Sequence, residues 1–213
     1  MDKPLIPQNL MDYIDSLVPA RPPEMQTMET EAEWTNFPII GPTSGYLCYQ
    51  VARMISAKRV FELGSGFGYS TAWFARAVTE NGGGEVYHVV WDEELSRQAR
   101  THLSALGYDD MIHYHVGEAV QTLRQASGLF DLIFNDIDKE SYPNSLPVIA
   151  EKLRPGGVLI VDNMLWHGRI FDGKDHTPAT DGIRELTGLL TNSPDWVTTL
   201  IPVRDGVMLA YKV

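Results

Sequence analysis

The chain has 213 residues, of which 44% are hydrophobic and 21% charged, and its formal net charge is -11. This length suits one sizeable core, and the acidity argues against a protein that wraps the phosphate backbone of nucleic acid. The single cysteine, Cys48, excludes an internal disulfide. No apolar run approaches the roughly 18 residues that span a membrane, and the N-terminus lacks a signal-peptide pattern. We therefore expect a cytoplasmic protein with no membrane or nucleic-acid partner.

The first 56 residues predict a helical arm ahead of the main fold. Helices are expected at 9–18, at about 24–35 and at about 43–56. Pro19 ends the first helix, because proline cannot continue the hydrogen-bond ladder. Leu47 and Val51 fall on one face of the third helix. Cys48 lies among apolar residues there, which favours a buried structural thiol over a nucleophile.

From residue 58 onward, short apolar runs alternate with helical stretches. Strands are expected at 59–63, 85–90, 111–115, 130–135 and 157–161, with helices at about 69–80, 92–106, 118–127 and 142–153. This alternation predicts a doubly wound, mostly parallel α/β sheet with helices on both faces. We interpret residues 1–213 as one domain that carries the helical arm at about 1–56.

The C-terminal part predicts a reversal of strand direction. The expected elements are a helix at about 179–191 and strands near 196–202 and 206–212. Asp205-Gly206 joins the two strands, and Asp-Gly between apolar runs is typical of a hairpin, so the last strand pair should be antiparallel. The preceding stretch, 163–178, is long for a loop in a compact domain, and such loops are often functional.

A glycine-rich loop follows the first predicted strand, in the segment FELGSGFGYS at 61–70. Ligands of open α/β sheets bind at the carboxyl ends of the strands, so this position suits a cofactor. A dinucleotide fingerprint would need glycine at position 69, which is Tyr69 here, and this disfavours a dehydrogenase. Glu62 lies two residues before the first glycine and suits a cationic or zwitterionic ligand such as S-adenosylmethionine. A tight turn without a ligand is the alternative.

Acidic residues follow two further predicted strands. Asp136 ends the strand at 130–135, and Asp162 and Asn163 end the strand at 157–161. Parallel strands share one edge, so these oxygens can converge with the glycine loop, and such hard ligands suit Mg²⁺. Lys139, near such a cation, suits a general base. The alternatives are helix-capping aspartates and an exposed surface lysine.

These segments together resemble the cation-dependent O-methyltransferase family that includes catechol and caffeoyl-CoA O-methyltransferases. Besides the glycine loop, the matching segments are FDLIFNDIDK at 130–139, LRPGG at 153–157 and DNMLWHG at 162–168. The likeness runs from about residue 40 to the C-terminus. The acidic segments are specific to this family, whereas many methyltransferases share the glycine loop.

The resemblance implies a class I methyltransferase fold, a small aromatic hydroxyl acceptor and a homodimer. It implies Lys139 as the base that takes the phenolic proton and a divalent cation, expected to be Mg²⁺, on Asp136, Asp162 and Asn163. The implied contacts to S-adenosylmethionine are Ile40, Gly41, Glu62, Gly64, Ser65, Gly68, Ser70, Asp92, Gly117, Ala119 and Asp136. Trp166, and also Trp91, could stack on the acceptor or on adenine, although a packing role is as plausible.

Three positions depart from the family pattern; Asn135 and Ile137 replace commoner residues, and the third departure matters most. The acid that usually holds the ribose hydroxyls is Val90 here, and Asp92 or Glu93 could take its place. Two other functions therefore stay open. One is a cation-independent methyltransferase that acts on another small-molecule nucleophile, and the other is a non-catalytic protein that binds S-adenosylmethionine.

Overall fold

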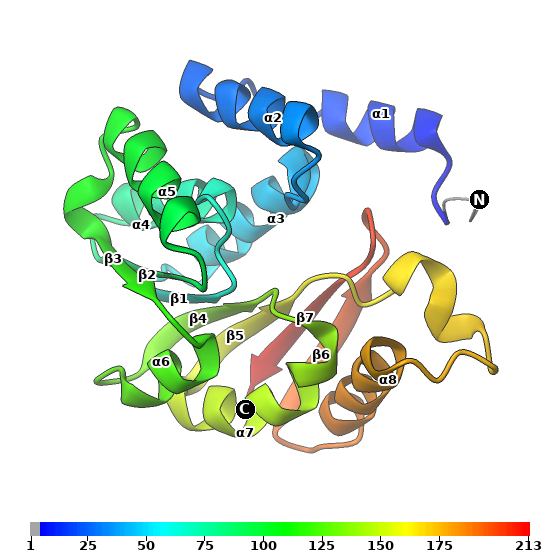
Figure 1. The fold of residues 1–213 in the computed structure, drawn as a ribbon. Coiled ribbons are helices and arrows are strands. Elements are labelled where there is room, and N and C mark those ends of the chain that lie inside the picture. Colours follow the sequence, from blue (N-terminus) through cyan, green and yellow to red (C-terminus); the bar gives the residue numbers. More distant parts are fainter. Residues whose placement is uncertain (1–4) are drawn as a thin grey trace.

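A computed structural model describes residues 5–213, and its centre is a seven-stranded sheet (Figure 1). The strands are β1 (Arg59–Leu63), β2 (Glu85–Val90), β3 (Ile112–Val116), β4 (Phe130–Asn135), β5 (Leu153–Val161), β6 (Trp196–Ile201) and β7 (Val207–Lys212). Their order in the sheet is β3-β2-β1-β4-β5-β7-β6. Strands β1 to β5 pair in parallel, and β7 is antiparallel to both β5 and β6. The predicted mostly parallel sheet and its antiparallel C-terminal pair are thus confirmed.

Helices cover both faces of the sheet (Figure 1). They are α1 (Gln8–Ser16), α2 (Pro23–Thr35), α3 (Gly41–Met54), α4 (Tyr69–Glu80), α5 (Glu93–Ala105), α6 (Ala119–Gln125), α7 (Tyr142–Lys152) and α8 (Pro178–Thr191). Three short 3₁₀ segments join them, η1 (Asp109–Met111), η2 (Lys139–Ser141) and η3 (Trp166–Phe171). Buried side chains from α2 to α5 form one core cluster, and those from α6 to α8 form a second on the opposite face.

Alternate residues of the central strands enter opposite cores. Val60 of β1 packs with the α2–α5 cluster, whereas its neighbour Phe61 packs with the α6–α8 cluster. Both side chains are completely buried. A strand that points successive side chains to opposite faces must be apolar throughout when both faces are covered. This explains the continuous apolar runs that predicted the parallel sheet.

Strand β5 begins earlier than its apolar run predicts. Leu153 already pairs with Phe130, four residues before the expected start at 157, and the register then shifts before Leu132. Gly156 lies at φ 73 within this irregular stretch. A bulge of this kind lets residues of low strand propensity join a ladder, which the apolar pattern alone does not reveal.

Helices α1 to α3, which precede the sheet, differ in how they pack. Helix α2 buries Met25, Met28 and Ala32, whereas α1 has no buried residue. Helix α3 buries Cys48, and burial raises the pKa of its thiol well above the usual value, which confirms a structural role. Within residues 5–213, no helix combines the length and apolar character that crossing a membrane requires.

Candidate functional site

The carboxyl ends of three neighbouring strands bring the predicted site together. Leu63, Asn135 and Val161, the last residues of β1, β4 and β5, pair at one level of the sheet. The residues that follow are tied to that edge, because the Asp136 amide donates to Leu63 O at 2.8 Å and the Asp162 amide to Asn135 O at 3.2 Å. Asp136 and Asp162 therefore leave the sheet beside the glycine loop, as the parallel topology predicted.

Close packing explains two of the loop glycines. Gly64 lies at φ 88, and a β-carbon there would approach Asp136 O to 2.5 Å. Gly68 lies at φ 93, and its β-carbon would lie 3.0 Å from that of Ala99 on α5. Glycine adopts such φ values without steric penalty. Gly64 thus lets two strand ends meet, and Gly68 lets α4 begin against α5.

Glu62 lies beneath the loop and is completely buried. Thr71 donates a hydrogen bond to its Oε2, and Oε1 has no hydrogen-bond partner in the part of the chain that the structure describes. Burial raises the pKa of Glu62 to about 7, although neighbouring hydroxyls, that of Ser70 foremost, favour the charged form. Glu62 does not line the cavity described next, so a cofactor contact by its carboxylate stays a prediction.

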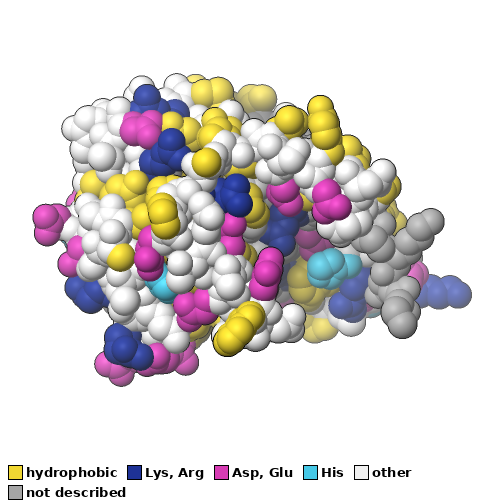
Figure 2. Space-filling model, turned by 90° about the horizontal axis from the view of Figure 1, so that it is seen from above, with side chains coloured by type: hydrophobic (Ala, Val, Ile, Leu, Met, Phe, Trp, Pro, Cys, Tyr) yellow, Lys and Arg dark blue, Asp and Glu magenta, His cyan; other side chains and the backbone are white. Residues whose placement is uncertain are grey.

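A cavity opens above the glycine loop. Its lining includes five of the predicted cofactor residues, namely Ile40, Gly64, Ser65, Ser70 and Asp136. It also includes residues that were not predicted as cofactor contacts, namely Phe37, Pro38, Ile39, Gly66, Phe67 and Tyr69. Figure 2, which shows the molecule from above the view of Figure 1, contains a hollow bordered by acidic, basic and histidine side chains.

The other predicted cofactor residues lie outside this lining. Gly41 is the first residue of α3, and Ala119 is the first of α6. Asp92 caps α5, because its Oδ1 accepts hydrogen bonds from two backbone amides of the first turn at 2.7 and 3.1 Å. The Gly117 amide donates to Val90 O at 2.9 Å, which places it next to the end of β2. Contacts of these residues with a cofactor stay predictions.

Two buried carboxylates and one ammonium form the charged centre of the site. Lys139 Nζ lies 2.8 Å from Asp136 Oδ1 and 3.1 Å from Ile137 O. Burial, together with the negative charge of Asp136, raises the pKa of Asp162 to about 7. Burial also raises the pKa of Asp136, against the opposing effect of Lys139. Two negative groups thus share a space with little water, and one cation partly compensates them.

This centre fits a hard divalent cation. Residues 5–213 contain no cluster of three or more His, Cys, Asp or Glu side chains able to hold a metal. The ligands that the sequence predicts for a cation, Asp136, Asp162 and the Asn163 amide oxygen, are of the oxygen types that Mg²⁺ and Ca²⁺ prefer, and their binding of a cation stays a prediction. A cation there would also relieve the repulsion that raises the pKa of Asp162. Lys139 occupies only one oxygen of Asp136.

The segment after β5 follows an unusual backbone path. Asn163, Trp166 and His167 have φ values of 57, 47 and 52°. The Trp166 ring lies 6.0 Å from Lys139 Nζ, and its Nε1 is buried without a hydrogen-bond partner in the described chain. Trp166 therefore borders the charged centre, as its proposed acceptor role requires, whereas Trp91 is 67% exposed after β2.

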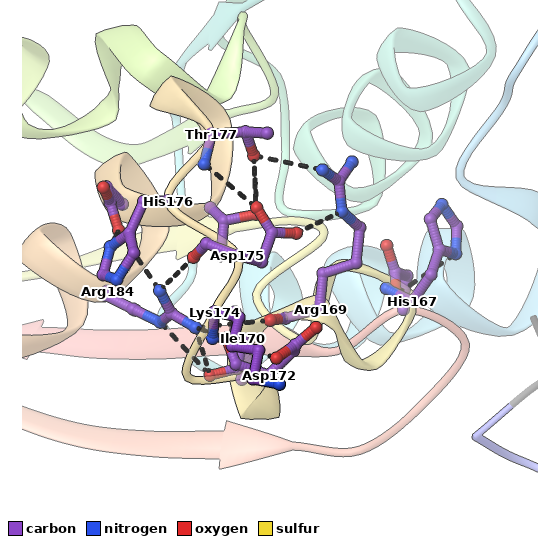
Figure 3. Close-up of polar contacts among 12 residues, drawn as sticks. His167, Arg169, Ile170, Asp172, Lys174, Asp175, His176, Thr177 and Arg184 are labelled. Carbon is purple, nitrogen blue, oxygen red and sulfur yellow. Dashed lines mark hydrogen bonds and ion pairs between the residues drawn. The ribbon is translucent and has the colours of Figure 1, made fainter.

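Helix α8 fixes the rest of the predicted functional loop (Figure 3). The Arg184 guanidinium donates to the carbonyl oxygens of Asp172 and Asp175, each at 2.6 Å, and to that of Ile170 at 3.1 Å. Arg169 binds the Asp175 carboxylate at 2.6 Å, and this hydrogen bond is the main reason why the pKa of Asp175 lies well below its usual value. The loop between Trp166 and α8 is thus held by side-chain hydrogen bonds, with η3 as its one regular element.

The β6–β7 turn contributes two site residues that the sequence analysis missed. Asp205 Oδ1 accepts a hydrogen bond from the His167 amide. Arg204 Nη1 donates to Ile39 O at 2.7 Å, and Ile39 lines the glycine-loop cavity. The Asp205-Gly206 pair indicated a hairpin turn, but no local pattern shows that this turn lies against residues 39 and 167.

Comparisons with known proteins agree with this geometry. An O-methyltransferase family model matches residues 24–213. A catechol O-methyltransferase from Mycobacterium tuberculosis is 30% identical over 87% of this chain and 85% of its own length. A caffeoyl-CoA O-methyltransferase from Populus trichocarpa is 25% identical over 89% of this chain and 81% of its own.

Solved structures show the same fold. The O-methyltransferase from Bacillus cereus, in complex with S-adenosylhomocysteine, has a TM-score of 0.87 and 25% identity over 96% of this chain and 97% of its own. TomG, an O-methyltransferase from Streptomyces achromogenes in complex with S-adenosylmethionine, has a TM-score of 0.86 at 25% identity, with 96% of each chain covered. The chain belongs to the O-methyltransferase family and is an S-adenosylmethionine-dependent O-methyltransferase.

Proposed function

We propose that this enzyme methylates a hydroxyl of a small, catechol-like aromatic acceptor with the help of a divalent cation. The observation that carries the proposal is the charged centre beside the glycine-loop cavity, where Lys139 Nζ lies 2.8 Å from Asp136 and Asp136 raises the pKa of Asp162. Relatives named catechol and caffeoyl-CoA O-methyltransferase support this acceptor class.

The residues of the site divide into two groups by the ligand that they would hold. The cavity lining, including Ile40, Ser65 and Ser70, would hold S-adenosylmethionine, which supplies the methyl group. Asp136, Asp162 and Asn163 would hold the cation, which lowers the pKa of an acceptor hydroxyl and fixes two vicinal oxygens. Alignment of acceptor and methyl group can lower the barrier by about 7–11 kcal/mol in favourable cases.

Lys139 would move the proton. In its neutral form it would accept the hydroxyl proton at Nζ, while hydrogen bonds to Asp136 Oδ1 and Ile137 O hold that nitrogen in place. General-base catalysis typically contributes a factor of roughly 100 to 10,000. The Trp166 ring borders the same space and offers an aromatic wall for a planar acceptor.

The test combines binding with turnover. Calorimetric titration with S-adenosylmethionine should show binding, and catechol methylation should require Mg²⁺ and stop with a chelator. Lys139→Ala should lower turnover roughly 100- to 10,000-fold and change cofactor affinity much less. Methylation that survives chelation would support a cation-independent enzyme. Binding without turnover on any diol would support a non-catalytic protein, and intact turnover in Lys139→Ala would exclude Lys139 as the base.

We also propose a homodimer. Helix α1 has no buried residue. Its Leu10 and Tyr13 side chains are 46% and 62% exposed, and that of Leu17, directly after the helix, is 62% exposed. Apolar side chains gathered on one helix are typical of a surface that another protein covers. Sedimentation should therefore give twice the mass of one chain, and a monomer at micromolar concentration would contradict the proposal.

A further inference from the structure

Arg204 lies in a backbone conformation that disfavours a side chain. Its φ is 50°, in the left-handed region. The turn is held there by the loop after β5, because the Met164 amide donates to Gly206 O at 2.9 Å and the Leu165 amide to Asp205 O at 2.8 Å. Strained residues cluster at functional sites, where surrounding contacts enforce them. The position therefore suggests that the Arg204 side chain has a use there.

The Arg204 guanidinium contacts the backbone at the rim of the glycine-loop cavity. Nη1 donates to Ile39 O at 2.7 Å, and Ile39 lines the glycine-loop cavity. Gly41 makes room for it, since a β-carbon there would lie 2.4 Å from Nη1. This is the single hydrogen bond of the Arg204 side chain to residues 5–213, and a guanidinium has five N–H donors. The side chain is exposed, so a ligand can reach the remaining donors.

The charge of Arg204 acts on the charged centre. Burial raises the pKa of Asp136 and of Asp162, and the positive charge of Arg204 opposes that rise in both. An acidic acceptor would be repelled by these carboxylates and by a chain of net charge -11. Lys139 is bound to Asp136, whereas a guanidinium with free donors can bind a carboxylate in a bidentate manner.

We propose that Arg204 binds a carboxylate on the acceptor, so that the enzyme prefers acidic catechols to neutral ones; this inference rests on the proposed function. The bound carboxylate lies between the β6–β7 turn and the connection from α2 to α3, and the two hydroxyls point to the charged centre. Arg204 is thus a specificity residue that binds the acceptor at the end opposite the reacting oxygen.

The experiment compares protocatechuate with its neutral amide, which has the same two hydroxyls. In the presence of Mg²⁺, the wild-type ratio of kcat/KM for acid over amide should be well above one. Arg204→Gln should lower this ratio roughly 10- to 100-fold, mainly through KM for the acid, as expected for loss of a charge-assisted hydrogen bond. Arg204→Lys should recover part of the ratio. The matched control Arg97→Gln, an exposed arginine on α5, should keep the wild-type ratio.

Two further measurements separate recognition from other roles. Arg204→Gly should lose the same preference without a lower Tm, because glycine relieves the positive φ. Calorimetry of both ligands on the S-adenosylhomocysteine complex should show tighter binding of the acid to wild type than to Arg204→Gln. If the wild type methylates neither acceptor, the proposed function fails, and this binding difference still supports or overturns the role of Arg204. The proposed role of Arg204 would be overturned if Arg204→Gln kept the wild-type ratio of kcat/KM for acid over amide. The same holds if the variant lost S-adenosylmethionine affinity tenfold while that ratio stayed constant.

Discussion

The site has a cofactor half, around the glycine loop, and an acceptor half, around the loop after β5 and the β6–β7 turn. Both halves contain residues with positive φ, but the residue types differ. Around the cofactor cavity, the positive φ values of 88, 50 and 93° belong to Gly64, Gly66 and Gly68. Around the expected acceptor position, values of 57, 47, 52 and 50° belong to Asn163, Trp166, His167 and Arg204. Glycine takes this conformation without steric penalty, whereas a residue with a β-carbon loses about 1–2 kcal/mol.

This difference indicates how each half is specified. The glycine loop adopts its shape because its own residues are glycines, so a sequence motif is enough to predict this loop. The acceptor half is enforced by contacts from elsewhere, such as the hydrogen bond from the His167 amide to Asp205. Strain kept in side-chain-bearing residues indicates that the side chains themselves matter. Acceptor choice should therefore depend on the second half.

The largest effect on stability should come from adding a β-carbon to the glycine loop in the cofactor half of the site. Gly64→Ala places a β-carbon 2.5 Å from Asp136 O, at φ 88, and should lower the free energy of unfolding by about 3 kcal/mol. Gly66→Ala is the matched control, because its β-carbon would meet the Phe37 ring at 3.0 Å and a side chain can yield. Urea unfolding and S-adenosylhomocysteine titration would measure both variants. Equal losses at the two positions would show that close approach to Asp136 does not require the glycine.

An intermediate effect should come from pH acting on Glu62. Its pKa is raised from 4.5 to about 7 by burial, so the folded protein keeps this proton to a higher pH than the unfolded chain does. The resulting stability is complete below pH 4.5 and is lost as pH rises to about 7. When the pH rises from 5 to 8, the free energy of unfolding should fall by about 1–3 kcal/mol less in Glu62→Gln than in the wild type. Asp136 and Asp162 stay in both proteins, so parallel losses in urea unfolding would contradict the assignment to Glu62.

The smallest effect should appear in the acceptor half. His167 lies at φ 52 with its side chain 67% exposed, so His167→Gly should raise the free energy of unfolding by about 0.5–1 kcal/mol. Lys174→Gly, at an exposed position of the same loop without positive φ, should lower it slightly. Thermal unfolding would measure both. A loss of stability in His167→Gly would mean that the contacts of the His167 ring, which lies 5.7 Å from the Trp166 ring and 3.6 Å from Asp205 Oδ1, outweigh the strain.

The fold was predictable where local patterns agree with packing. The runs at 59–63, 85–90 and 130–135 became β1, β2 and β4 with the same bounds, because strands buried on both faces are mostly apolar. The start of β5 was not predictable, since Leu153 joins the sheet only through its pairing with Phe130. The role of Asp92 was not predictable either. Whether this residue caps a helix or also contacts ribose depends on how the neighbouring elements are placed.

The sequence by itself determined the α/β class, the glycine loop and the convergence of Asp136 with Asp162, because these follow from periodicity and from the shared edge of parallel strands. Only the tertiary structure placed the Arg204 side chain against Ile39, 165 positions away in the chain. It also placed Trp166 near Lys139 and buried Glu62 beneath the loop. Such contacts join segments distant in the chain, and their geometry is set by how whole elements pack, which no local pattern encodes.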